Sequence, residues 1–219
     1  MTVTLAEEVV LLSLDARSGA ARRRQAAGWA VAGGILLELV MARRVSVTGK
    51  YLELRDPAPT GVRLLDGRIQ LIGSWLRGRS KRRVTDWLTK DHSHAVGAVL
   101  DSLAERGVVG SEVRKVPGVF PQRRYPGSDA AVERELRERL GRVVLGGAEP
   151  DARTAGLISL LHAAGLHGPA FPDRPAREVA PRMGEIAAGQ WAGKSVRAAV
   201  RDMQAAAVTA TVFMASAPV

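Results

Sequence analysis

The most constraining feature of this sequence is an apolar stretch from Ala26 to Met41, which reads AAGWAVAGGILLELVM. Its single charged residue is Glu38, and none of its helical faces is polar, so a helix formed here must be covered by protein on all sides. With 16 residues, three glycines and a carboxylate, the stretch is too short and too polar to cross a bilayer. We therefore predict a central core helix whose glycines allow neighbouring helices to approach closely.

Glu38 is the exceptional residue of this helix. We expect it to lie near the helix end and to pair with Arg43 or Arg44. A catalytic role is the alternative, but no second acid or histidine lies near Glu38 in the sequence to share acid–base chemistry.

Composition limits the possible functions. A chain of 219 residues has room for one large core, so we expect a single domain spanning residues 1–219. The absence of cysteine excludes disulfides, thiolate catalysis and Cys-based metal sites. The start of the chain carries Glu7 and Glu8 and no basic residue, which does not resemble a signal peptide, so a cytosolic location is expected. The net charge of +10 implies nucleic acid or an anionic membrane surface as partner, unless the basic surface is merely solvated.

Hydrophobic spacing predicts an all-α fold, mainly a helical bundle around the central hydrophobic helix, with one or two small β-hairpins. A capping box, Thr4-Leu5-Ala6-Glu7, starts the first helix. The further predicted helices cover Val62–Leu76, a short segment from Val84, Val96–Leu103 with Gly107 as its C-cap, Ala130–Val144 after Asp129, Arg153–Ala164, and two C-terminal stretches, the second from about Gln190 to Ala215. The predicted hairpins pair Val45–Val47 with Tyr51–Leu54, and Glu112–Val116 with Phe120–Tyr125.

Two short segments concentrate the positive charge. Arg22, Arg23 and Arg24 precede the central helix at the positive end of its dipole, so helix stability does not explain them. Five cations occur in the seven residues from 77 to 83, the densest basic cluster in the chain. We predict that both segments contribute to an anion-binding surface, with these candidate residues: Arg22, Arg23, Arg24, Arg79, Lys81, Arg82 and Arg83.

The tip of the second hairpin, Val116-Pro117-Gly118-Val119-Phe120, is apolar although it lies between basic residues. If the tip folds back on the core, it is ordinary packing. If it is exposed, it forms a wedge for a membrane or a protein partner.

The sequence contains no signature of an enzyme. Asp91-His92-Ser93-His94 brings triad residue types together only in sequence, whereas a triad is defined by geometry, so we expect a polar helix entry there. The two histidines have no third ligand at zinc-site spacing, and no glycine-rich phosphate loop is present. We therefore expect no catalytic residue, no metal and no cofactor.

Two binding functions agree with the charge. The region from Val99 to Tyr125 resembles the recognition helix and wing of winged-helix DNA-binding regulators, but the presumed recognition helix, Ala95–Arg106, has almost no side chain that reads bases, and an apolar tip does not suit DNA. On an anionic membrane, each cation near the surface contributes about 1 kcal/mol. An inserting tip would add a second weak signal, which peripheral proteins usually need.

Several motifs occur in a characteristic order along the chain. They are TLAEEVVLLSL from Thr4, GGILLEL from Gly33, APTGVRLLD from Ala58, VTDWL from Val84, LAERGVV from Leu103, the apolar tip, and GGAEPDARTAGLISLLHAAGL from Gly146. In this order they resemble the Golgi phosphoprotein 3 family in its bacterial form. The resemblance implies an all-helical bundle around a hydrophobic helix, with a protruding β-hairpin.

The resemblance also implies a function. Eukaryotic members of the family bind phosphatidylinositol 4-phosphate on Golgi membranes and act as adaptors for glycosyltransferases. By analogy, this chain is expected to be a peripheral protein on the cytosolic membrane face, with an anionic lipid and a client membrane protein as partners and with Val116, Val119 and Phe120 inserting into the membrane. The family's headgroup positions are occupied here by Arg23, Ala32, Ser93 and Val96. Since Arg23 is the only one of these four residues with a cationic side chain, the basic clusters are expected to provide a less selective anionic-lipid surface.

Overall fold

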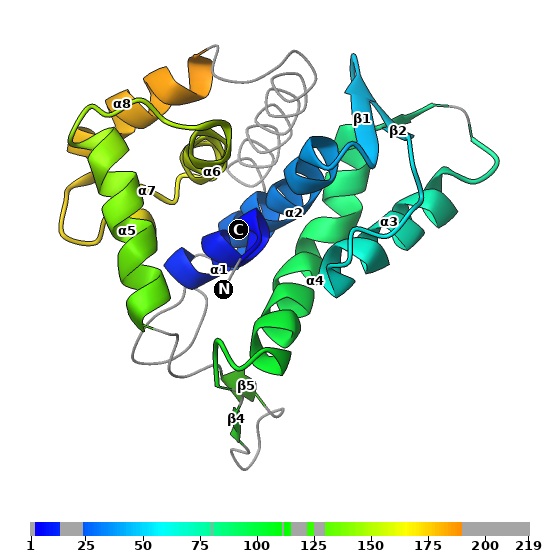
Figure 1. Ribbon diagram of the computed structural model, residues 1–219, viewed down its shortest axis with the longest axis horizontal. Coiled ribbons are helices and arrows are strands. Elements are labelled where there is room, and N and C mark those ends of the chain that lie inside the picture. Colours follow the sequence, from blue (N-terminus) through cyan, green and yellow to red (C-terminus); the bar gives the residue numbers. More distant parts are fainter. Residues whose placement is uncertain are drawn as a thin grey trace, which may run out of the picture.

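The computed structural model describes residues 3–13, 24–79, 81–110, 112–114, 122–124 and 130–189. The helices and strands follow one another as α1 Leu5–Ser13, α2 Arg24–Met41, β1 Val45–Thr48, β2 Tyr51–Leu54, α3 Arg63–Leu76, β3 Arg82–Arg83, α4 Val84–Glu105, β4 Glu112–Arg114, β5 Gln122–Arg124, α5 Ala130–Val144, α6 Ala152–Ala163, α7 His167–Ala170 and α8 Ala176–Ala188. Figure 1 shows α1 and α2 in the middle of the molecule, with α3 and α4 on one side and α5 to α8 on the other. The predicted mainly helical fold is confirmed.

The central position of α2 follows from its composition. Every residue from Ala30 to Val40 except Glu38 is buried, and the helix packs against α1, α3, α4 and α6. Two of its three glycines lie where neighbouring backbones come close: a Cβ on Gly28 would lie 2.6 Å from the His92 carbonyl oxygen of α4. A Cβ on Gly34 would lie 3.0 Å from the backbone nitrogen of Ala6 in α1. The prediction of a wrapped helix with close glycine contacts is confirmed.

The capping box at the start of α1 forms as predicted. The Thr4 backbone N–H donates to the Glu7 carboxylate at 2.7 Å, and the Glu7 N–H donates to the Thr4 hydroxyl at 3.3 Å. All nine residues of α1 are buried. A helix this short is only marginally stable alone, so its packing against the neighbouring helices stabilises it.

The first hairpin is also confirmed. Strands β1 and β2 pair antiparallel from Val45↔Leu54 to Thr48↔Tyr51, leaving Gly49 and Lys50 as a two-residue turn. Gly49 has φ +62°, the left-handed conformation that such a turn requires at its first position. Strand β3 was not predicted; it pairs with β2 and extends the hairpin to a three-stranded sheet of order β1-β2-β3.

The expectation of two separate helices after residue 84 was wrong, because α4 runs without interruption for 22 residues. Asp91 therefore lies in the middle of a helix and not at a polar helix entry. Its carboxylate accepts from Arg68 of α3 at 3.1 Å, and both side chains are buried. This ion pair explains how a polar residue occupies the inward face of α4. Gly107, with φ +70°, follows the helix as predicted, and the Val108 N–H bonds to the Leu103 carbonyl.

Most of the remaining elements agree with the sequence. Strands β4 and β5 pair antiparallel from Glu112↔Arg124 to Arg114↔Gln122, and α5 has the predicted bounds. Asp151 caps α6 through a 2.6 Å bond from the Thr154 N–H. The single-turn helix α7, which was not predicted, follows α6. The predicted cap at Asp129 and the last predicted helix lie outside the described residues.

Candidate functional site

The densest basic segment is the connection between α3 and α4, and β3 fixes its end. The register places Arg83 opposite Tyr51 and Arg82 opposite Leu52. Since neighbouring residues of a strand point to opposite faces, Arg82 shares the inner face with the buried Leu52, and Arg83 shares the outer face with Tyr51. The two arginines therefore have different surroundings.

Arg82 is held against aromatic rings. Its guanidinium lies 4.6 Å from the centre of the Trp75 ring, and Trp75 lies 5.5 Å from Trp87, which is 2% exposed. At this distance the ring faces attract the cation and orient it. Arg82 is half-buried, so part of its role is to attach β3 to α3 and α4.

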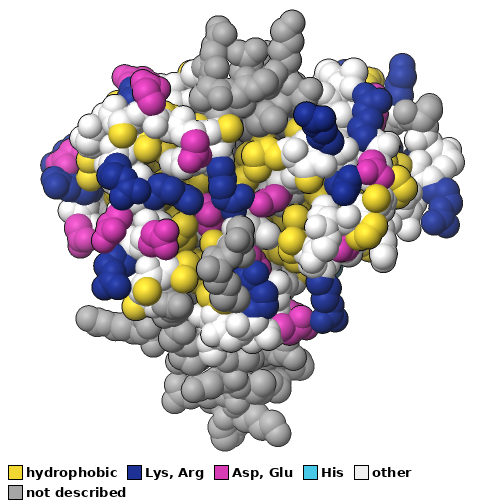
Figure 2. All heavy atoms as spheres, viewed as in Figure 1, with side chains coloured by type: hydrophobic (Ala, Val, Ile, Leu, Met, Phe, Trp, Pro, Cys, Tyr) yellow, Lys and Arg dark blue, Asp and Glu magenta, His cyan; other side chains and the backbone are white. Residues whose placement is uncertain are grey.

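The other cations of the segment face solvent. Arg77, Arg79, Lys81 and Arg83 are exposed, and none of them forms an ion pair with a carboxylate in the described part of the chain. Figure 2 shows cations protruding where the molecule carries β1, β2 and the end of α3, whereas cations and acids are intermixed over α5. The basic segment thus retains its charge for an external partner.

The sequence analysis predicted Lys81 on this surface but missed Lys50 and Tyr51. The ammonium groups of Lys50 and Lys81 lie 5.8 and 5.7 Å from the centre of the Tyr51 ring. Lys50 belongs to the β1–β2 turn, so the sheet brings it to the basic segment although 30 residues separate it from Lys81 in the chain. A lysine at a hairpin turn was visible in the sequence, but its position relative to the segment depends on β3.

Most of the other predicted site residues are not among those that the structure describes. Arg22, Arg23, Val116, Val119 and Phe120 lie outside the described residues, and Arg24 is the first residue of α2. The basic segment adjoins the first turn of α4, whereas the β4–β5 hairpin follows its last turn (Figure 1). Twenty-two helical residues span about 33 Å. The two predicted membrane contacts are therefore attached to opposite ends of one rigid helix.

Two of the four positions expected from the family's headgroup site are part of the core. Ala32 is fully buried, Val96 is 3% exposed, and Ser93 is exposed. Nearby, the rings of Trp29 and His92 stack at 4.4 Å between α2 and α4. Buried Ala32 and Val96 offer no donor to a phosphate, so these positions cannot provide the headgroup contacts that arginines would make.

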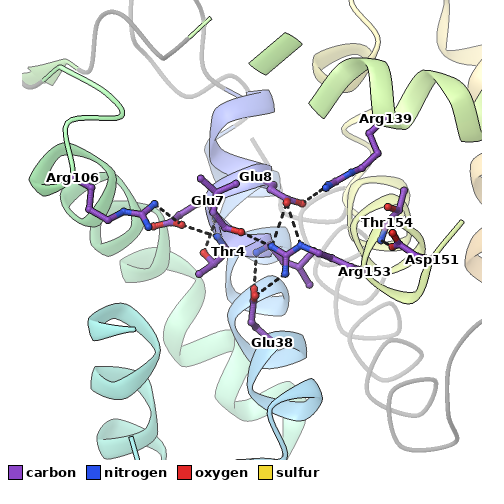
Figure 3. A network of polar contacts seen from close by, with 11 residues as sticks. Thr4, Glu7, Glu8, Glu38, Arg106, Arg139, Asp151, Arg153 and Thr154 are labelled. Carbon is purple, nitrogen blue, oxygen red and sulfur yellow. Dashed lines mark hydrogen bonds and ion pairs between the residues drawn. The ribbon is translucent and has the colours of Figure 1, made fainter. Parts of the chain in front are cut away.

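A second concentration of charge lies inside the molecule, around the start of α1 (Figure 3). Glu7 is fully buried and accepts hydrogen bonds from Ser102 at 3.1 Å and Arg106 at 3.0 Å, both near the end of α4. These bonds add to the bond from the Thr4 N–H. The Glu7 carboxylate therefore joins α1 to α4.

Glu8 makes the corresponding connection on the other side. It is 2% exposed and accepts from Arg139 of α5 at 2.8 Å and from Arg153 of α6 at 3.2 Å. Burial raises the pKa of Glu8 above its ordinary value, and the charges of Arg153 and Arg139 oppose that rise. The two guanidinium groups thus compensate a carboxylate that would otherwise be unfavourable in the core.

Arg153 is the most connected residue of this network. It donates to Glu38 at 2.8 Å, to Glu8, and to the Val3 carbonyl at 2.5 Å. Glu38 also accepts from the Leu5 N–H at 2.6 Å. The expected pairing of Glu38 with Arg43 or Arg44 was therefore wrong, since Arg44 pairs with Asp56 instead. Glu38 serves to anchor α1 and α6 to the central helix.

The chemistry of this interior network favours a structural role. Its three glutamates each accept from an arginine, and α1, α2, α4, α5 and α6 all contribute to it. Within the residues that the structure describes, no three His, Asp or Glu side chains are grouped as in a metal site. Among the described helices, none combines the length and apolar character needed to cross a membrane.

Comparison with known proteins agrees with the fold. The family description Golgi phosphoprotein 3 (GPP34) matches residues 5–203, which is most of the chain. No curated protein matches the chain significantly. The chain belongs to the Golgi phosphoprotein 3 family.

Proposed function

We propose that this protein is a non-enzymatic, adaptor-like peripheral membrane protein that recognises anionic lipid headgroups through its basic surface. The observation that carries the proposal is the solvent-facing segment of Arg79, Lys81 and Arg83, which no described carboxylate neutralises. Arg82 fixes the position of this segment, because its guanidinium packs on the ring of Trp75. Family membership supports lipid binding and adaptor function as the class of activity.

The strength of such a contact follows from the number of cations. At about 1 kcal/mol for each cation near an anionic leaflet, four cations contribute about 4 kcal/mol, which corresponds to a dissociation constant of about 1 mM. This is weak, so stable attachment needs a second contact. The apolar tip of the β4–β5 hairpin, with Val116, Val119 and Phe120, is the proposed second contact, and a client membrane protein would add a third.

The two contacts constrain the orientation of the protein. Since they are attached to opposite ends of α4, both reach one flat membrane only if α4 lies roughly along its surface. The same helix argues against the DNA alternative, because its end buries Val99, Leu100 and Leu103, and these apolar side chains cannot donate hydrogen bonds to base edges. We therefore propose membrane binding on the cytosolic face rather than nucleic-acid binding.

Vesicle sedimentation tests the proposal. We expect the wild-type protein to sediment with anionic vesicles at low salt, and salt to weaken the binding. Arg79→Ala with Arg83→Ala removes two cations and should weaken binding about thirtyfold, and Phe120→Asp should weaken it further. The matched control is Arg142→Ala with Arg177→Ala, which removes the same charge from exposed positions on α5 and α8. If the wild type ignores anionic vesicles at low salt, or if the control loses as much binding, the proposal is wrong.

A further inference from the structure

The aromatic ring of Tyr51 is the centre of a small group of cations. Lys50 and Lys81 each hold their ammonium group within 6 Å of the ring, and Arg83 is its cross-strand neighbour. Side chains directly opposite each other on one sheet face have Cβ atoms about 5 Å apart. Three cations from two segments, the β1–β2 turn and the connection between α3 and α4, therefore lie near one half-buried ring.

The backbone fixes this arrangement. The turn that carries Lys50 is tight, and the Lys50 carbonyl accepts from the Val84 N–H, the first residue of α4, at 3.0 Å. Lys81 and Arg83 flank Arg82, whose guanidinium is held over Trp75. The cations are thus attached to a braced sheet edge rather than to a free loop.

The charge of this group is not neutralised nearby. On the outer face of β2 the acid next to Tyr51 is Glu53, and its carboxylate is bound by Arg55 at 2.7 Å. No described carboxylate forms an ion pair with Lys50, Lys81 or Arg83. Three neighbouring cations repel one another, so a ligand that brings two negative groups compensates them better than a ligand that brings one.

We propose that Lys50, Lys81 and Arg83, grouped around Tyr51, form a headgroup subsite for a membrane lipid that carries two phosphate groups. This inference rests on the proposed membrane function and adds a lipid class to it. Lys50 and Lys81 come from different segments, so each can contact a different phosphate, and the Arg83 guanidinium can donate two hydrogen bonds to either phosphate. A headgroup with a single phosphodiester can neutralise only one of the two lysines at a time.

The test compares vesicles of phosphatidylglycerol with vesicles of cardiolipin, whose headgroup holds two phosphates, at equal total surface charge. We expect the wild type to bind the cardiolipin vesicles about tenfold more tightly. Lys50→Ala with Lys81→Ala should remove this preference and weaken binding to cardiolipin vesicles about thirtyfold. Tyr51→Leu, which keeps the cations and removes the ring that orients them, should weaken it about threefold.

The control, Arg142→Ala with Arg177→Ala, has the same net charge as the lysine variant and should keep the preference. Equal wild-type binding to both vesicles at equal charge would overturn the subsite while leaving membrane binding intact, and so would a preference that survives in the lysine variant. Failure to bind either vesicle would instead contradict the proposed function. Duplex DNA added as a competitor should not displace the protein from vesicles at stoichiometric amounts; displacement would assign the subsite to nucleic acid and overturn the inference.

Discussion

Arg153→Ala tests whether the interior network stabilises the fold. The side chain bonds to Glu8, Glu38 and the Val3 carbonyl, and the two carboxylates are 2% and 16% exposed. Removing one partner of a buried ion pair costs about 3–5 kcal/mol, because the remaining charge is left in the core. Arg153 is itself 29% exposed, so water replaces part of the lost contact. We expect a loss of about 3 kcal/mol in the free energy of unfolding.

The assay is thermal and urea unfolding followed by circular dichroism. For a chain of this size, 3 kcal/mol lowers Tm by about 6–12 °C. The matched control is Arg63→Ala, which removes a surface ion pair with Glu105. The Arg63 side chain is 87% exposed and the Glu105 side chain 55%. Such exposed pairs contribute about 0–1 kcal/mol. If Arg153→Ala is no more destabilising than Arg63→Ala, the network does not stabilise the protein and the reasoning fails.

The effect of Arg153→Ala should also depend on pH. Burial already raises the pKa of Glu8, and losing the Arg153 charge raises it further. A carboxyl whose pKa is higher in the folded state favours folding at low pH, and that contribution is lost as the pH rises through the folded-state value. The variant should therefore lose less stability at about pH 5 than at about pH 7.5. A penalty that stays constant or grows on acidification would refute this electrostatic explanation.

Two further variants test local features of the fold. Asp151→Ala removes the cap bond to the Thr154 N–H and should lower the free energy of unfolding by about 1 kcal/mol in urea unfolding, whereas Asp151→Asn, which keeps an acceptor, should lose much less. Gly28→Ala should cost about 1–3 kcal/mol and lower Tm, because its Cβ would lie 2.6 Å from the His92 carbonyl oxygen and force α2 and α4 apart. A neutral Gly28→Ala would show that the two helices tolerate a wider spacing.

The sequence predicted those elements whose signals are local. The unbroken apolar character of α2, the reciprocal spacing of Thr4 and Glu7, and the glycine in the β1–β2 turn each determine structure within a few residues. Each of these predictions is confirmed. The bounds of α5 were also predicted, because its apolar positions recur at helical spacing between charged ones.

The errors come from contacts between residues distant in the sequence. The polar group around Asp91 appeared to separate two helices, but Arg68 from another helix allows Asp91 to remain on the buried face of α4. Glu38 was assigned to the nearest arginines, whereas its partner is 115 residues away. Strand β3 has only two residues, too few to show the alternation of apolar and polar residues that identifies a strand. Without β3, the sequence does not place Lys50 and Tyr51 next to the basic segment.

The structure separates the residues that hold the fold together from those proposed to bind lipid. The interior network meets α4 near its last turn, through Ser102 and Arg106, whereas the sheet that carries Lys50 and Lys81 adjoins its first turn. These two ends lie about 33 Å apart, beyond the range at which exposed charges influence each other at physiological salt. Substitution of the surface lysines should therefore change binding without changing stability. A loss of vesicle binding in those variants can then be assigned to the surface itself and not to unfolding.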